Sequence, residues 1–128
     1  MAKNTELKLT FYGDDITGST DAMEALVLAG VPTVLFLSPP TLKQVSEKFP
    51  HIQAVGLAGM SRTMTPKEME DSLPAAFSSL KQLDAPVTHY KVCSTFDSSP
   101  SIGSIARAAE LGMNAFNSKI VPVAVGAP

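Results

Sequence analysis

Apolar and polar positions divide the chain into short runs of strand length, separated by stretches with helical spacing. The strand-like runs cover residues 7–12, 33–37, 53–58, 87–92 and 120–125. Between them, apolar residues recur three or four positions apart, as on a helix with one buried face. Strands that alternate with helices form parallel sheets covered on both faces. We therefore predict a three-layer, Rossmann-like α/β fold with about five strands and flanking helices.

The predicted helices carry recognisable start and stop signals. The clearest is a capping box, with Thr65 at the N-cap, Pro66 at the first helical position and Glu68 at the third. Pro74 is expected to kink this helix. The other helices are expected over residues 21–29, 41–48 and 99–112. No linker or internal repeat interrupts the alternation, so the pattern indicates a single domain.

Charged side chains stand where three of the predicted strands end. Asp14 and Asp15 follow the first strand, Arg62 follows the third, and Lys91 lies near the end of the fourth. Right-handed crossovers bring the carboxyl ends of parallel strands to one edge of the sheet. An acidic pair repels itself there unless a cation or a hydrogen-bonding ligand compensates. We therefore expect these side chains to meet in a binding site.

Each of these side chains also has an ordinary structural interpretation. One aspartate can cap the following helix while the other does chemistry, or both can be turn and cap residues. The guanidinium of Arg62 suits a carboxylate or phosphate ligand, or an ion pair with one of the acids. Lys91 needs a partner if buried, or it extends its ammonium to solvent. Spacing alone leaves these alternatives open.

A loop rich in hydroxyl groups follows the fourth strand. Ser94, Thr95 and Ser98 can cradle an oxyanion, although such residues also cap helices. Cys93 is expected to be a small core residue, because the sequence places no base beside it to activate the thiol.

Composition excludes several classes of function. A net charge of −2 and a pI near 5.6 give no basic footprint for nucleic acid. One cysteine and two histidines supply neither a disulfide nor a zinc cage, and we expect no metal site. No apolar run is long enough for a membrane span, and a cytoplasmic location is expected. No glycine-rich phosphate loop is present, so these residues predict no nucleotide site.

Three segments carry a resemblance to a known family. Residues 13–22 read GDDITGSTDA, the dipeptide Ser61-Arg62 follows the third strand, and residues 90–95 read YKVCST. Together they resemble the four-carbon acid sugar kinase family, and the resemblance covers essentially the whole chain. It implies the N-terminal, sugar-acid-binding domain of a two-domain kinase. The fifth predicted strand ends where its loop should begin, so we expect residues 1–128 to be a fragment of a longer protein.

The family resemblance implies a reaction. Members phosphorylate acid sugars such as threonate, erythronate or 3-oxo-tetronate with ATP and Mg²⁺, and a separate C-terminal domain supplies the nucleotide site. The chain alone is then expected to be inactive. By resemblance, Asp14 and Asp15 are the catalytic pair. The implied substrate-binding residues are Asp14, Asp15, Arg62, Lys91, Cys93, Ser94, Thr95 and Asp97.

Two of these positions depart from the family pattern. Cys93 stands where the family usually has aspartate, and Phe96-Asp97 replace leucine and arginine. Exchanging an arginine for an aspartate reverses a local charge, which bears directly on the choice of substrate. Two other functions stay open: a non-catalytic module that binds sugar acids, and a receiver-like domain that accepts phosphate. Against the second, no aspartate follows the third strand. A homo-oligomer is also left open.

Overall fold

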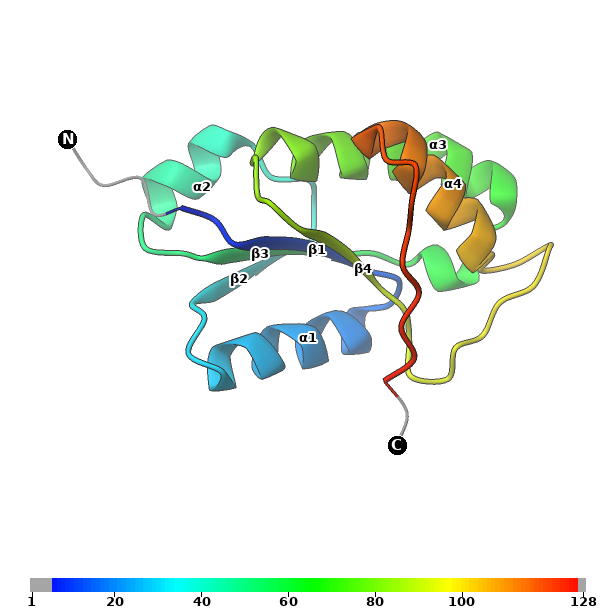
Figure 1. The fold of residues 1–128 in the computed structure, drawn as a ribbon, viewed down its shortest axis with the longest axis horizontal. Helices are drawn as coiled ribbons and strands as arrows, with labels where there is room; N and C mark the ends of the chain where they lie inside the picture. Colours follow the sequence, from blue (N-terminus) through cyan, green and yellow to red (C-terminus); the bar gives the residue numbers. More distant parts are fainter. Residues whose placement is uncertain (1–5, 127–128) are drawn as a thin grey trace.

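Four parallel strands and four α-helices form the domain, in a computed structural model that describes residues 6–126 (Figure 1). The elements are β1 (Leu9–Gly13), α1 (Ile16–Leu28), β2 (Thr33–Phe36), α2 (Leu42–Lys48), β3 (Ala54–Ala58), the 3₁₀ turn η1 (Ser61–Thr63), α3 (Pro66–Gln82), β4 (Thr88–Lys91) and α4 (Ile105–Phe116). Helix α1 covers one face of the sheet, and the other three helices lie on the opposite face. The predicted three-layer α/β fold is confirmed.

The strand order places β1 inside the sheet. The order is β2-β3-β1-β4, and β1 pairs in parallel with both β3 and β4. Gly13, the last residue of β1, lies opposite Ala58 on one side and Lys91 on the other. The residues that follow Gly13 therefore start between the ends of two neighbouring strands, where ligands of open α/β sheets bind.

The hydrophobic core lies between the sheet and α3. Met69, Leu73 and Leu80 of α3 are almost fully inaccessible to solvent, as their spacing on one face predicts. Tyr12 of β1 stacks on Tyr90 of β4, with ring centroids 5.5 Å apart. Burying one large apolar side chain contributes about 1.5–3 kcal/mol. This layer therefore fixes β1 and β4 beside each other.

The predicted fifth strand is wrong. Residues 117–126 contain neither helix nor strand, and the side chains of Ile120 and Val123 are mainly exposed. Figure 1 shows this red segment running back past α4 towards the opposite side of the molecule. Pro122 has no N–H to donate in the middle of the run, which disfavours pairing along β4. The sheet therefore has four strands within residues 6–126.

Two helix starts also differ from the predictions. Helix α1 begins at Ile16, five residues earlier than expected, because Asp15 caps it. Helix α4 begins at Ile105 with Ser104 as its cap, whereas Ser99 closes a separate turn by accepting the Ile102 N–H at 2.9 Å. Serine suits both a cap and a turn, so composition could not separate the two sites.

Of two further helix predictions, one is confirmed and one is wrong. The capping box at Thr65 and Glu68 is confirmed, and α3 continues through Pro74 to Gln82. The predicted end of α4 at Gly112 is wrong, because the helix runs on to Phe116 and ends at Asn117, whose φ of 51° is left-handed. Asparagine takes this conformation more easily than most residues.

Candidate functional site

Main-chain hydrogen bonds join the ends of β1, β3 and β4. The Asp14 N–H donates to the Lys91 carbonyl, and the Arg62 N–H donates to the Asp14 carbonyl, both at 3.0 Å. The Gly59 N–H also donates to the Gly13 carbonyl at 2.9 Å. The structure therefore brings together the residues that the sequence places at three separate strand ends. We call the side chains of Asp14, Asp15, Arg62, Lys91 and Asp97 the charged cluster.

Asp15 is the residue that caps α1. Its Oδ1 accepts the Gly18 N–H at 2.8 Å, and its Oδ2 lies 3.5 Å from Nη1 of Arg62. A Cβ at position 18 would lie 2.4 Å from Asp15 Oδ1 and 2.8 Å from Lys91 Nζ, so any larger residue there would displace these side-chain ends. The helix N-terminus favours a negative charge at this point. Both oxygens of Asp15 are therefore already engaged.

Asp14 is in a different situation. Its side chain is buried, at 3% exposure, and its Oδ1 has no hydrogen-bond partner within residues 6–126. Burial, followed by the charge of Asp15, raises the pKa of Asp14, while the Cys93 amide, Lys91 and Arg62 act in the opposite direction. A buried carboxylate with a raised pKa and an unused oxygen is well suited to accept a proton.

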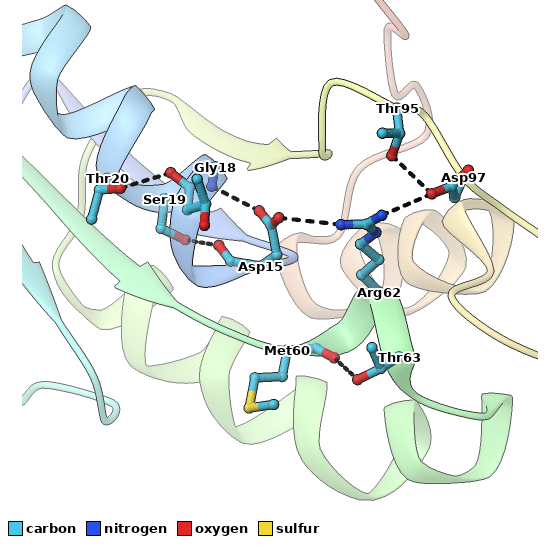
Figure 2. A network of polar contacts seen from close by, with 10 residues as sticks. Asp15, Gly18, Ser19, Thr20, Met60, Arg62, Thr63, Thr95 and Asp97 are labelled. Carbon is cyan, nitrogen blue, oxygen red and sulfur yellow. Dashed lines mark hydrogen bonds and ion pairs between the residues drawn. The ribbon is translucent and has the colours of Figure 1, made fainter.

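Arg62 lies between two carboxylates, as Figure 2 shows. Its Nη2 is 2.9 Å from Oδ2 of Asp97, on the side away from Asp15. The same Asp97 oxygen accepts the Thr95 hydroxyl at 2.8 Å. These two hydrogen bonds, that of Thr95 first, lower the pKa of Asp97. Of the alternatives left open by the sequence, the structure therefore has Arg62 in ion pairs with acids.

Lys91 is the cation of the cluster that has no ion pair. Its side chain is partly buried, and no carboxylate of residues 6–126 lies within 4.0 Å of its ammonium. Its Nζ lies over the first turn of α1, beside Gly18. A partly buried ammonium with no carboxylate in direct contact can still pair with an anionic ligand. Lys91 is therefore the most available anion receptor of the cluster.

The loop after β4 is held in a tight turn. The Phe96 N–H donates to the Cys93 carbonyl at 2.9 Å, and Phe96 has a φ of 53°, an uncommon value for a bulky residue. Ser94 and Thr95 are exposed. Cys93 is only partly buried, so the expectation that it is a core residue is wrong. It follows Lys91 by two residues and therefore stays at the edge of the sheet.

The sequence assigned no supporting role to three residues that hold the cluster in place, Ser61, Tyr90 and Gly103. Ser61, which is fully buried, forms a 2.7 Å hydrogen bond with the hydroxyl of Tyr90 and so fixes η1 against β4. Gly103 has a φ of 63°, and a Cβ there would lie 2.4 Å from the Arg62 carbonyl. For Gly103, the only signal in the sequence was its place directly before Ser104, the cap of α4. Its role depends on a contact across 41 positions of sequence, which the pattern does not show.

The charged cluster lies outside the two cavities that we describe. One, of about 330 Å³, includes Leu7, Leu42 and Val45 in its lining. The other, of about 480 Å³, lies between α3 and α4 beside Pro74 and Leu111. Within residues 6–126, no group of three His, Cys, Asp or Glu side chains is placed to hold a metal ion. In the same range, no helix is long and apolar enough to cross a membrane.

Comparison with known proteins identifies the family. Residues 9–128 match the family described as the sugar-binding N-terminal domain. The chain belongs to this family. This confirms the resemblance to the N-terminal, sugar-acid-binding domain of the four-carbon acid sugar kinases. The sugar-binding domain is 52% identical over 122 residues to 3-oxo-isoapionate kinase of Paraburkholderia graminis, a match that covers 95% of the chain and 26% of that protein.

Two other proteins extend the comparison. The domain is 32% identical over 111 residues to 3-oxo-tetronate kinase of Escherichia coli K12, covering 87% of the chain and 27% of that protein. A crystal structure from Salmonella typhimurium LT2, provisionally described as a tRNA synthase, superposes with a TM-score of 0.74 and 29% identity. This superposition covers 88% of the present chain and 26% of the Salmonella chain. The chain thus spans about a quarter of the length of these proteins.

Proposed function

We propose that this domain is the substrate-binding part of an ATP-dependent kinase that phosphorylates a hydroxyl of a four-carbon acid sugar or a related 3-oxo sugar acid. Relatives at 52% and 32% identity are named as kinases of such compounds. The observation that carries the proposal is the buried Asp14 carboxylate, whose Oδ1 has no partner in residues 6–126. It lies at the end of β1, beside a lysine without an ion pair.

Binding of the sugar acid is proposed to begin at Lys91. Its ammonium would hold the substrate carboxylate by a charge-assisted hydrogen bond. The exposed hydroxyls of Ser94 and Thr95 would contact the substrate hydroxyls. Such contacts orient the reacting group, which is the main contribution that a protein makes to phosphoryl transfer.

Asp14 is proposed as the general base. Its Oδ1 would take the proton of the substrate hydroxyl as the hydroxyl oxygen attacks the phosphoryl group that ATP supplies. The raised pKa of Asp14 makes its carboxylate a better proton acceptor than an ordinary aspartate. Asp15 is less suited, because it caps α1 and contacts Arg62.

The described residues do not fit the nucleotide itself. The sequence has no glycine-rich phosphate loop. The N-terminus of α1, where a phosphate could otherwise bind, carries Asp14 and Asp15. We therefore propose that ATP and Mg²⁺ bind mainly outside this chain, in a C-terminal domain, and that residues 1–128 alone have little or no turnover. A cytoplasmic location and a homo-oligomer stay predictions.

The test uses the longer protein with ATP and a panel of acid sugars that includes threonate, erythronate and their 3-oxo forms. We expect ATP-dependent phosphorylation of at least one of them. Asp14→Asn should lower kcat by about 10²-fold or more. Asp71→Asn, an exposed aspartate paired with Lys67 on α3, is the control and should keep full activity. Unchanged turnover in Asp14→Asn would refute the assignment of the base.

A second function applies to the chain by itself. Lys91 has no ion pair within residues 6–126, and the sequence has no glycine-rich phosphate loop, so the chain alone would behave as a module that binds sugar acids without turnover. Calorimetry with the same panel tests this, after circular dichroism has shown that the chain is folded. The receiver-like alternative is disfavoured, because β3 is followed by Gly59, Met60 and η1, with no aspartate to accept phosphate.

A further inference from the structure

The ion pair between Arg62 and Asp97 joins two segments that are 35 positions apart. The charged cluster contains three carboxylates and two cations, so its formal charge is −1. Arg62 has one carboxylate at 2.9 Å and another at 3.5 Å, and its side chain is about one-third exposed. Its donors, which would otherwise bind a ligand anion, already face carboxylates of the protein.

Asp97 is held in place by its own loop. Thr95 donates to the same carboxylate oxygen that contacts Arg62 (Figure 2), and the neighbouring Phe96 has left-handed backbone geometry. The Ser98 hydroxyl accepts the Ile105 N–H at 3.0 Å, which ties the following residue to the start of α4. The position of Asp97 is therefore fixed from both sides of the loop.

On the basis of the proposed function, we propose that Asp97 determines specificity by occupying Arg62 as an internal carboxylate. The site then offers one free cation, Lys91, and holds a ligand with a single carboxylate. The end of the ligand that approaches Arg62 and Asp97 is uncharged, a hydroxyl or carbonyl group. A ligand with a second anion at that end meets Asp97 and Asp15, and like-charge contact disfavours it.

Threonate and tartrate test this proposal, because they share a four-carbon skeleton and two hydroxyl-bearing carbons. They differ at one end, where threonate has a CH₂OH group and tartrate has a second carboxylate. Calorimetry on the wild-type protein without ATP should show that threonate binds more tightly than tartrate. In Asp97→Asn, the preference for threonate should shrink by about fivefold, because Arg62 becomes available to the second carboxylate.

Two control variants show whether the effect belongs to the Asp97 carboxylate. Asp71→Asn removes an aspartate that is also 63% exposed and also ion-paired, but on α3. It should leave the preference unchanged. Asp97→Glu keeps the carboxylate and should retain the preference for threonate. Circular dichroism and thermal unfolding confirm that each variant is folded.

The outcomes separate this proposal from the proposed function. If the wild-type protein binds threonate and Asp97→Asn keeps the same preference, Asp97 does not determine specificity. Tartrate binding by Asp97→Asn, without threonate binding by the wild-type protein, would exclude threonate as the substrate and support the role of Asp97. Binding of neither compound by either protein would overturn the proposed role of Asp97, whereas the proposed function fails only if no acid sugar of the panel, 3-oxo forms included, is phosphorylated.

Discussion

The two faces of the sheet differ in how much apolar surface they bury. On the α3 face, Leu73, Phe77 and Leu80 are at most 2% exposed. On the α1 face, Val27 is 51% exposed and Leu28 is 80% exposed. Burial of apolar area is the main stabilising contribution to folding. The α3 face therefore holds the domain together, whereas α1 contributes the capped turn that faces the charged cluster.

The charged cluster is distinct from the layer that contributes most to stability. The charged cluster is built on the ends of β1, β3 and β4 and on the first turn of α1. Its least favourable feature, the unpaired oxygen of Asp14, is buried beside the well-packed layer that contains Tyr12 and Tyr90. A buried polar atom without a partner costs about 1–3 kcal/mol. The packing on the α3 face offsets this cost.

The largest expected effect comes from Phe77. Phe77→Ala removes a ring that contacts Tyr12, Tyr90 and Phe116, and it should lower the free energy of unfolding by about 3–5 kcal/mol. Leu28→Ala on the α1 face, where the side chain is mainly exposed, should change it by less than about 0.5 kcal/mol. Urea unfolding followed by circular dichroism measures both. Equal effects would remove the distinction between the faces.

Asp14, the proposed general base, should lower the stability of the fold. Its pKa is raised in the folded state, so the folded protein binds the proton more tightly than the unfolded chain does. Its ionised form is therefore destabilising above the folded-state pKa, and this penalty disappears as the pH falls below the unfolded-state value. Asp14→Asn should raise the free energy of unfolding at pH 7 by about 1 kcal/mol.

The measurement for Asp14 is thermal unfolding of wild type and Asp14→Asn between pH 7 and acid pH. The difference between the two proteins should narrow as the pH falls, since Asp14 then becomes protonated. Asp71→Asn, measured in parallel, controls for the loss of an exposed acid. A lower stability of Asp14→Asn at pH 7 would show that the ionised carboxylate is stabilised by contacts that outweigh its burial.

Asp15 should show an effect of similar size and opposite sign. Asp15→Ala removes the cap of α1 and should lower the free energy of unfolding by about 1 kcal/mol. Asp15→Asn keeps a good capping side chain and should lose less. Chemical denaturation of the pair measures the difference. If alanine and asparagine have the same effect, the contribution of Asp15 comes from its charge near Arg62 and not from the cap.

Much of the fold could be predicted from the sequence because it depends on local spacing. Four strands and the start of α3 follow from apolar runs and from the Thr65 capping box. The start of α1 could not be predicted in this way. Gly18 and Ser19 are poor helix formers, and they lie inside α1 because the helix approaches β1 closely: a Cβ at Gly13 would lie 1.9 Å from the Ser19 hydroxyl.

The site could be predicted only in part, for a related reason. Parallel topology was enough to bring Asp14, Arg62 and Lys91 to one edge. Which of two adjacent aspartates caps α1 is decided by backbone geometry, since both have the same side chain. The pairing of Arg62 with Asp97 depends on the path of a loop with no regular structure. Roles set by long-range contacts are therefore the part that spacing does not reveal.

The hydrogen bonds that join the strand ends have an evolutionary consequence. The Asp14 amide and carbonyl link β4 and η1 through the main chain, and the Gly59–Gly13 bond links β3 to β1 in the same way. Main-chain bonds persist when side chains are exchanged. Positions such as Cys93 and Asp97 can then vary while the frame that carries them stays constant. Such a frame gives related proteins a way to acquire new ligands one side chain at a time.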